Sequence, residues 1–215
     1  MTVVKICGVT TPEDALAAAQ LGADMLGLNF YPPSPRYVDT ARAREIAQAV
    51  RAEYPTILVG VFVNTDRRTI DRIMDEAGLD LAQLSGDEPP SQTAAVAGRA
   101  VKAIRPRSLA EATALAEAFL PHAPSDGRFP ALLVDAYHPA LYGGTGEMAS
   151  TTVANALRDL TARLMLAGGL TPDNVRQRVE AVRPWGVDVA SGVEYPDDKT
   201  RKDPDRMAAF IRAAR

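Results

Sequence analysis

Short apolar runs, many of them β-branched, alternate along the chain with longer segments of helical spacing, and this alternation recurs eight times. The strand candidates are Val3–Cys7, Met25–Phe30, Ile57–Phe62, Leu81–Leu84, Ala100–Ile104, Ala131–Asp135, Leu164–Ala167 and Val187–Ser191. Ala-rich segments such as Pro12–Leu21, Thr40–Ala52 and Asp66–Ala77 lie between them. A strand followed by a helix, repeated in this way, predicts a parallel sheet with helical crossovers.

Helix start signals support this interpretation at two places. Thr11-Pro12-Glu13-Asp14 offers an N-cap, a proline in the first turn and two carboxylates at the positive end of the helix dipole. Thr171-Pro172-Asp173 repeats the same pattern, which predicts another helix start there.

Eight such units in 215 residues predict a compact (β/α)8 TIM barrel of the α/β class. The alternative is an open doubly wound sheet, which usually has fewer strands and a glycine-rich first turn. Here the first strand ends in Cys7-Gly8-Val9-Thr10, which is not that fingerprint. No linker interrupts the pattern, so we expect residues 1–215 to form a single barrel domain.

Composition excludes several classes of function. The net charge of −3 gives no basic footprint for nucleic acid, and no apolar run approaches the ~20 residues of a membrane helix. One cysteine and no visible secretory signal are typical of a cytoplasmic protein. The two histidines, His122 and His138, are too few for a His-rich metal site, so no metal is expected. No exposed apolar stripe marks an interface, which leaves monomer and homodimer both open.

Two polar residues close predicted strands, where barrels place their active sites. A lone cysteine is most often an inert buried residue, but Cys7 precedes a glycine at the mouth of the barrel. A thiolate there can act as a base or nucleophile if nearby positive charge lowers its pKa. Asp135 closes an apolar run and either caps the next turn or acts as a general acid, provided burial raises its pKa. Together the two residues suit proton shuttling on a phosphosugar.

A charged residue inside the barrel needs a partner. Lys5 lies two residues before Cys7 and therefore points to the same inner face. Asp188, on the neighbouring last strand, has the matching parity. We expect a Lys5–Asp188 ion pair beneath Cys7, and the sequence leaves open whether that pair affects the thiol or is only structural.

Glycines follow the last two strands, at Gly168-Gly169 and Ser191-Gly192. One such pair would indicate only a tight turn. Two pairs on neighbouring strands favour a phosphate site, because glycine lets backbone N–H groups approach an anion closely. The expected ligand is therefore a small phosphosugar.

Two loops complete the candidate site. Arg36 follows three prolines within five residues, and this stiff loop favours a guanidinium held for a carboxylate over an ordinary surface arginine. The stretch Gly143-Gly144-Thr145-Gly146 after the sixth strand is typical of a mobile lid, and it lacks the spacing of a Walker lysine.

A series of short motifs runs through the whole chain in order. They are Val4-Lys5-Ile6-Cys7-Gly8, Gly22-Ala23-Asp24, Gly27-Leu28-Asn29-Phe30, Ser34-Pro35-Arg36, Val59-Gly60-Val61-Phe62-Val63-Asn64, Gln83-Leu84-Ser85-Gly86-Asp87-Glu88, Leu133-Val134-Asp135, Gly143-Gly144-Thr145-Gly146, Leu166-Ala167-Gly168-Gly169-Leu170, Asn174-Val175, Asp188-Val189-Ala190-Ser191-Gly192-Val193-Glu194 and Lys202-Asp203. In combination they resemble the phosphoribosylanthranilate isomerase family, which acts in tryptophan biosynthesis.

The resemblance implies an Amadori rearrangement that needs no cofactor. The substrate would be N-(5-phosphoribosyl)anthranilate and the product 1-(2-carboxyphenylamino)-1-deoxyribulose 5-phosphate. By family analogy, Asp135 is the general acid that opens the ribose ring, and Cys7 is the general base that takes the proton from the second sugar carbon.

The same resemblance assigns the binding residues. Arg36 would hold the anthranilate carboxylate, and backbone groups of Gly169, Ser191 and Gly192 would hold the phosphate.

The chain departs from the family at Ser85, where relatives usually carry histidine, which indicates a local change of packing or pocket. A second departure is Pro196–Arg201, where relatives often have a glycine before the Lys-Asp pair. The nearest competing activity is the sister sugar isomerase of histidine biosynthesis, which uses an aspartate where this chain has Cys7. The sequence also leaves open an enzyme that accepts both substrates and a catalytically silent barrel that binds a phosphosugar.

Overall fold

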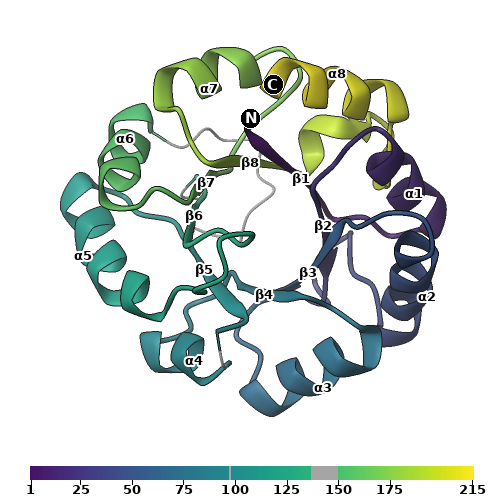
Figure 1. The fold of residues 1–215 in the computed structure, drawn as a ribbon, viewed down its shortest axis with the longest axis horizontal. Coiled ribbons are helices and arrows are strands. Elements are labelled where there is room, and N and C mark those ends of the chain that lie inside the picture. The colour runs from purple at the N-terminus through teal and green to yellow at the C-terminus, as the bar shows by residue number, and fades with distance from the viewer. Residues whose placement is uncertain (97, 137–149) are drawn as a thin grey trace.

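Eight parallel strands close into a barrel in the computed structural model, which describes residues 1–96, 98–136 and 150–215. Neighbours along the chain are neighbours in the sheet, and the eighth strand closes against the first (Figure 1). The strands are β1 (Val3–Cys7), β2 (Met25–Asn29), β3 (Ile57–Phe62), β4 (Leu81–Leu84), β5 (Ala100–Ile104), β6 (Leu132–Val134), β7 (Leu164–Leu166) and β8 (Gly186–Val189). The predicted (β/α)8 barrel is confirmed.

Within the described parts of the chain, eight α-helices form a ring around the barrel (Figure 1). They are α1 (Pro12–Gln20), α2 (Thr40–Arg51), α3 (Arg67–Ala77), α4 (Pro90–Ala95), α5 (Leu109–Phe119), α6 (Thr151–Leu160), α7 (Val175–Val182) and α8 (Pro204–Ala214). The predicted start of α1 is confirmed, because Thr11 caps it by accepting a hydrogen bond from the N–H of Asp14.

The core has two layers because side chains alternate along each strand. Inward-pointing residues such as Met25, Val59, Leu81 and Met165 fill the barrel. Outward-pointing residues such as Val4 pack against the helices. This alternation places Lys5 and Cys7 on the inner face, as their parity predicts.

One predicted helix start is wrong. The segment at Thr171 forms a turn, and α7 begins only at Val175. The side chain of Asn174 accepts a hydrogen bond from the Thr171 N–H (2.9 Å) and donates one to the Gly169 carbonyl (2.8 Å). These two bonds hold the backbone in a turn, so the Thr-Pro-Asp pattern lies before the helix rather than at its first residue.

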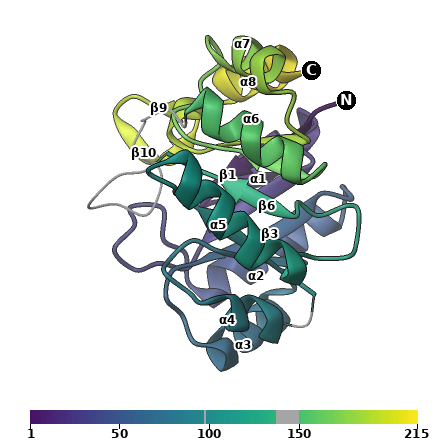
Figure 2. The same ribbon diagram turned by 90° about the vertical axis from the view of Figure 1, so that its left-hand side faces the viewer.

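A small hairpin follows β8, where the sequence pattern predicts no strands. The 3-10 helix η2 (Ser191–Val193) leads into β9 (Glu194–Tyr195), which pairs with β10 (Asp198–Lys202). Figure 2 shows this hairpin at one end of the barrel and the N-terminus toward the other. A second 3-10 helix, η1 (Leu120–His122), follows α5.

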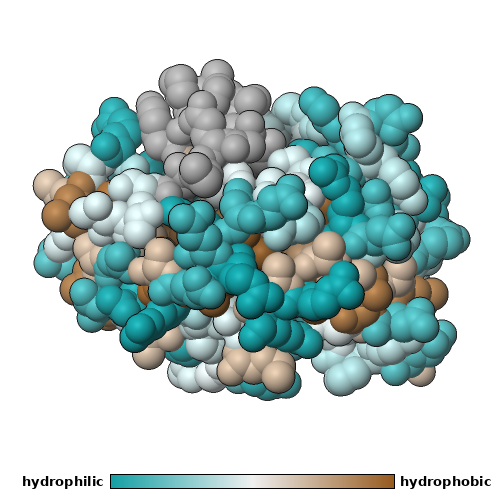
Figure 3. Space-filling model, turned by 90° about the horizontal axis from the view of Figure 1, so that it is seen from above, coloured by the Kyte–Doolittle hydropathy of each residue, from teal (hydrophilic) through white to brown (hydrophobic). Residues whose placement is uncertain are grey.

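The face of the helix ring that carries α7 and α8 is mostly hydrophilic (Figure 3). Figure 3 looks onto the side of the molecule that carries α7 and α8, where hydrophobic side chains lie in small separate groups. Among the described residues, no helix has both the length and the apolar character required to cross a membrane.

Candidate active site

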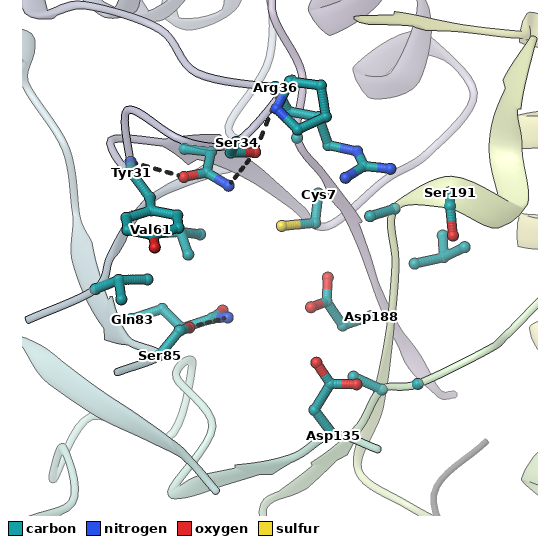
Figure 4. A pocket seen from close by; sticks show the side chains of 18 of the residues that line it. Cys7, Tyr31, Ser34, Arg36, Val61, Gln83, Ser85, Asp135, Asp188 and Ser191 are labelled. Carbon is teal, nitrogen blue, oxygen red and sulfur yellow. Dashed lines mark hydrogen bonds between the residues drawn. The ribbon is translucent and has the colours of Figure 1, made fainter. Parts of the chain in front are cut away.

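A cavity of about 440 Å³ opens where the strands of the barrel end. Residues from the ends of β1, β2, β3, β4, β6, β7 and β8 line it, including Cys7, Asp135, Arg36, Gly169 and Ser191. Figure 4 shows Asp188 between Cys7 and Asp135 along one side of this cavity, with Gln83 and Ser85 on the other side. The structure therefore brings most of the predicted site residues around one space.

Cys7 lies at the end of β1, and two features determine the chemistry of its thiol: burial and the nearby Lys5 ammonium. Its Sγ atom and the Nζ atom of Lys5 both pack over Gly27 of β2, at 2.7 Å and 3.0 Å from where a Cβ on that glycine would lie. Burial raises the pKa of the Cys7 thiol above its ordinary value, although the Lys5 ammonium opposes this shift. The sequence left open whether Lys5 affects the thiol; its ammonium does act to lower the pKa of Cys7, but burial outweighs it.

The predicted ion pair beneath the thiol is confirmed. The Lys5 Nζ lies 2.9 Å from Oδ1 of Asp188, and the Lys5 side chain is almost completely buried. Burial lowers the pKa of Lys5, but the Asp188 carboxylate and the Cys7 sulfur outweigh this effect and raise it overall. Lys5 is therefore held as an ammonium between a carboxylate and the thiol.

Asp135 follows β6 directly and lines the same cavity. Its Oδ1 accepts a hydrogen bond of 2.7 Å from the N–H of Ala136. A Cβ on Gly168, which has a φ of +89°, would lie 3.0 Å from that oxygen, so the glycine leaves room for the carboxyl group. Burial raises the pKa of Asp135 to about 6, with a further contribution from the charge of Asp188. This is the direction that a general acid requires.

The glycine-rich ends of β7 and β8 lie against each other. Gly169 and Ser191 line the cavity, whereas Gly192 packs against the carbonyl oxygen of Leu170, where a Cβ would overlap it. Glycine at 192 therefore lets the two strand ends approach closely, and it is not among the lining residues.

Arg36 lines the cavity with its guanidinium already engaged by a carboxylate of this chain. Its Nε donates to Oε1 of Glu194 (2.6 Å) and its Nη2 donates to Oε2 (2.9 Å). Both side chains are largely buried, at 11% and 4% exposure. Burial acts to lower the pKa of Arg36, but the hydrogen bonds and charge of Glu194 raise it overall. The two Nη1 N–H groups and one on Nη2 take no part in the Glu194 pair.

Lys202 is the third member of this group. Its Nζ lies 2.8 Å from Oε1 of Glu194 and 3.1 Å from the carbonyl oxygen of Ala190, and its side chain is fully buried. Burial lowers the pKa of Lys202, and the Glu194 carboxylate opposes this shift. Glu194 and Lys202 belong to motifs of the sequence, but sequence reasoning assigned them no role. The one signal that could have found them is that charged residues there lie next to a predicted phosphate loop.

Ser85 follows β4 and lies on the cavity wall opposite Asp135, as Figure 4 shows. Its hydroxyl accepts a hydrogen bond of 3.2 Å from Nε2 of Gln83, and both side chains are buried. The predicted change of pocket at Ser85 therefore lies on the wall of the site itself. The expected lid, Gly143-Gly144-Thr145-Gly146, lies outside the described residues.

Within the three described stretches, no group of three or more His, Cys, Asp or Glu side chains is arranged to hold a metal ion.

Comparison with known proteins gives one consistent result. The model of the N-(5'-phosphoribosyl)anthranilate isomerase family matches residues 4–213. A protein of that name from Citrifermentans bemidjiense is 44% identical and covers 100% of this chain and 98% of its own length. One from Neisseria gonorrhoeae is 43% identical, with coverage of 98% and 95%.

Solved structures agree with the sequence matches. The phosphoribosylanthranilate isomerase of Thermotoga maritima superposes with a TM-score of 0.86 at 34% identity, covering 100% of this chain and 98% of that one. A further structure of such an isomerase holds reduced 1-(o-carboxyphenylamino)-1-deoxyribulose 5-phosphate and superposes with a TM-score of 0.82 at 33% identity, with the same coverage. Another related structure is described as monomers generated from a dimeric isomerase.

Proposed function

Because the chain belongs to the N-(5'-phosphoribosyl)anthranilate isomerase family, we propose that it is an isomerase of tryptophan biosynthesis that uses Cys7 and Asp135 as its acid–base pair. It converts N-(5-phosphoribosyl)anthranilate into 1-(2-carboxyphenylamino)-1-deoxyribulose 5-phosphate. The observation that carries this proposal is the placement of Cys7, at the end of β1, and Asp135, after β6, on one cavity in the barrel.

The first step opens the sugar ring. Asp135 donates its proton to the ring oxygen while the bond between that oxygen and the first sugar carbon breaks. The lone pair of the anthranilate nitrogen forms a double bond to the carbon, which gives a protonated Schiff base. A carboxyl group with a pKa of about 6 retains a proton at higher pH than an ordinary aspartate, which supports this role.

The second step breaks a carbon–hydrogen bond at the second sugar carbon. The Cys7 thiolate removes the proton from the second sugar carbon, and the electron pair forms a double bond to the first carbon while the nitrogen becomes neutral. The resulting enolamine gains a proton at the first carbon and loses one from its hydroxyl, which yields the ketone. The reaction is an internal redox exchange in which no external oxidant or reductant takes part.

Lys5 supports the thiolate in this scheme. Its ammonium packs beside Cys7 Sγ over Gly27 and is fixed by Asp188 at 2.9 Å. A positive charge held next to sulfur stabilises the thiolate relative to the thiol, which offsets part of the cost of burial.

The ends of the substrate bind on the β8 side of the cavity. Arg36 offers its remaining N–H groups to the anthranilate carboxylate. The backbone at Gly169 and Ser191, which line the cavity, and at the adjoining Gly192 offers N–H groups to the phosphate. The ligand of the related structure carries both a carboxyl group and a phosphate, which supports this placement.

The test is the loss of anthranilate fluorescence when the purified protein is mixed with freshly generated phosphoribosylanthranilate. We expect rapid conversion by the wild-type protein and none above background by folded Cys7→Ala or Asp135→Asn. The substrate of the histidine-pathway isomerase is tested in parallel by absorbance. Wild-type turnover in either variant contradicts the role of that residue, and conversion of neither substrate contradicts the function.

A further inference from the structure

We propose that Glu194 and Lys202 are positioning residues for Arg36, and that the three side chains form one carboxylate-recognition unit. Glu194 fixes the plane of the guanidinium, and Lys202 keeps the unit positively charged. This inference rests on the proposed function, because it assumes that Arg36 receives the substrate carboxylate.

The Arg36–Glu194 geometry fixes orientation. Two hydrogen bonds, of 2.6 Å from Nε and 2.9 Å from Nη2, run to separate oxygens of one carboxylate. Such a two-point contact prevents the planar guanidinium from rotating about its last bond. The edge that carries Nη1 is therefore the edge left for a ligand. A Cβ on Gly8 would overlap the Arg36 Cδ, so the aliphatic stem is also held against the end of β1.

The third residue, Lys202, is needed because it supplies the net positive charge of the unit. A guanidinium paired with a carboxylate is neutral as a unit and attracts a further anion weakly. Lys202 lies 2.8 Å from the same Glu194 oxygen that Arg36 Nε contacts, so two cations share one anion. With all three groups ionised, the unit carries a net charge of +1, which suits an anionic ligand in a buried site.

The hairpin after β8 holds the unit in place. Glu194 of β9 and Lys202 of β10 are paired in register, so the two side chains face each other across the hairpin. The backbone N–H of Lys202 donates to Asp14 of α1 (2.9 Å), and the Arg201 guanidinium forms an ion pair with that carboxylate. Lys202 Nζ also donates to the Ala190 carbonyl, directly before the proposed phosphate loop.

The experiment compares two stable ligands. One is reduced 1-(o-carboxyphenylamino)-1-deoxyribulose 5-phosphate, and the other is the same compound without the carboxyl group. Titration calorimetry gives Kd for both with the wild type, Arg36→Ala, Glu194→Gln and Lys202→Gln. Glu76→Gln is the matched control, because it removes a carboxylate from an exposed Arg–Glu pair on α3.

We expect Glu194→Gln to weaken binding of the carboxylated ligand about 10-fold or more, because one buried charged hydrogen bond is lost. Binding of the ligand without the carboxyl group changes less than about 2-fold, and the control changes neither value. Lys202→Gln, which retains the Arg36–Glu194 pair, shows the same selective loss. In turnover, both variants raise KM more than they lower kcat, as expected when ground-state and transition-state binding are weakened alike.

Tighter binding of the carboxylated ligand by Glu194→Gln overturns the inference, because it would show that Glu194 only weakens the positive charge of Arg36. Equal weakening of both ligands by folded Glu194→Gln and Lys202→Gln also overturns it, because a structural role would act that way. If Arg36→Ala alone abolishes discrimination between the ligands, the inference fails and the proposed role of Arg36 stands. If no variant, Arg36→Ala included, affects discrimination, both fail.

Discussion

The Nζ atom of Lys5 lies 2.9 Å from Oδ1 of Asp188, across the line where the last strand of the barrel closes against the first. The two residues are paired in register on β1 and β8, and the lysine side chain is 1% exposed. A buried ion pair costs desolvation on both sides, so its retention at the base of the cavity points to a functional reason. The thiol that Lys5 contacts supplies one.

We expect the alkylation of Cys7 to report this pairing. The chain has one cysteine, so the reaction with iodoacetamide measures this thiol alone. The pH midpoint of the alkylation rate lies above the ordinary thiol value of about 8.5, because burial raises the pKa of Cys7. Lys5→Met raises the midpoint further, because it removes the largest contribution that opposes burial.

A second variant guards against misfolding of Lys5→Met, which leaves Asp188 buried without its cation. Lys5→Met/Asp188→Asn removes both charges. Its midpoint still lies above that of the wild type, because the lowering effect of Lys5 on the pKa of Cys7 is larger than the raising effect of Asp188. A midpoint equal to or below that of the wild type in both variants would show that the pair is only structural.

The pH dependence of kcat/KM follows from the two shifted groups. The active form has Asp135 protonated and Cys7 ionised, so the pair carries one proton in total. Below about pH 6 both groups are protonated, and kcat/KM therefore rises with pH to a plateau that begins near 6. The plateau ends only above the raised pKa of Cys7.

Asp188→Asn tests the assignment of the acidic limb. The Asp188 charge contributes to the raised pKa of Asp135, and its removal leaves the lowering effect of the Lys5 ammonium on that pKa unopposed. The start of the plateau therefore moves to lower pH. A kcat/KM that falls as pH rises through 6, in the wild type, would contradict the order of the two pKa values.

Asp135→Asn is expected to stabilise the protein while it abolishes turnover. The folded pKa of about 6 exceeds the ordinary value of 3.8, so the contribution of Asp135 to stability is fully present below about 3.8 and lost as pH rises through 6. At pH 7.5 the ionised carboxylate costs up to about 3 kcal/mol, from about 1.4 kcal/mol per pKa unit. The neutral amide avoids that cost and can still accept the Ala136 N–H.

Urea unfolding at pH 7.5 and pH 4.5 measures this effect. The gain of Asp135→Asn is largest at the higher pH and falls to about a third of that at the lower one, where the folded carboxyl is protonated. Asp71→Asn, which removes an exposed ion pair on α3, is the control and changes the free energy of unfolding by less than about 0.5 kcal/mol. A gain of equal size at both pH values would mean that burial of the charge is not its cause.

The barrel could be predicted because short apolar strand runs alternate eight times with segments of helical spacing. The side chains of β1 that point into the barrel could be predicted because successive side chains of a strand point to opposite faces. The Lys5–Asp188 pair could be predicted for the same reason, since both parity and strand order are sequence properties. The turn at Thr171 could not be expected, because it depends on a hydrogen bond from the Thr171 N–H to the side-chain oxygen of Asn174.

The partners of the site residues and the direction of the Cys7 pKa shift could not be predicted from the sequence. Arg36 and Glu194 are 158 residues apart, and they meet because the hairpin after β8 brings Glu194 beside the loop that follows β2. The direction of the Cys7 pKa depends on a balance between burial and one ammonium, and a sequence gives the charge but not the burial. Residue types at strand ends thus indicated the chemistry, and three-dimensional packing determined the partners.

Gly27→Ala is expected to impair catalysis without unfolding the barrel. A Cβ there would lie 2.7 Å from Cys7 Sγ and 3.0 Å from Lys5 Nζ, so the methyl group must displace both. Because catalytic groups tolerate little misplacement, we expect kcat to fall about 10- to 100-fold. Gly78→Ala at the end of α3 is the control: its φ of +70° makes alanine costly by about 1 kcal/mol, yet no atom lies within 4 Å of the new Cβ. It should lower the free energy of unfolding with kcat unchanged, whereas wild-type kcat in folded Gly27→Ala would show that the position of Cys7 beside Lys5 is not required.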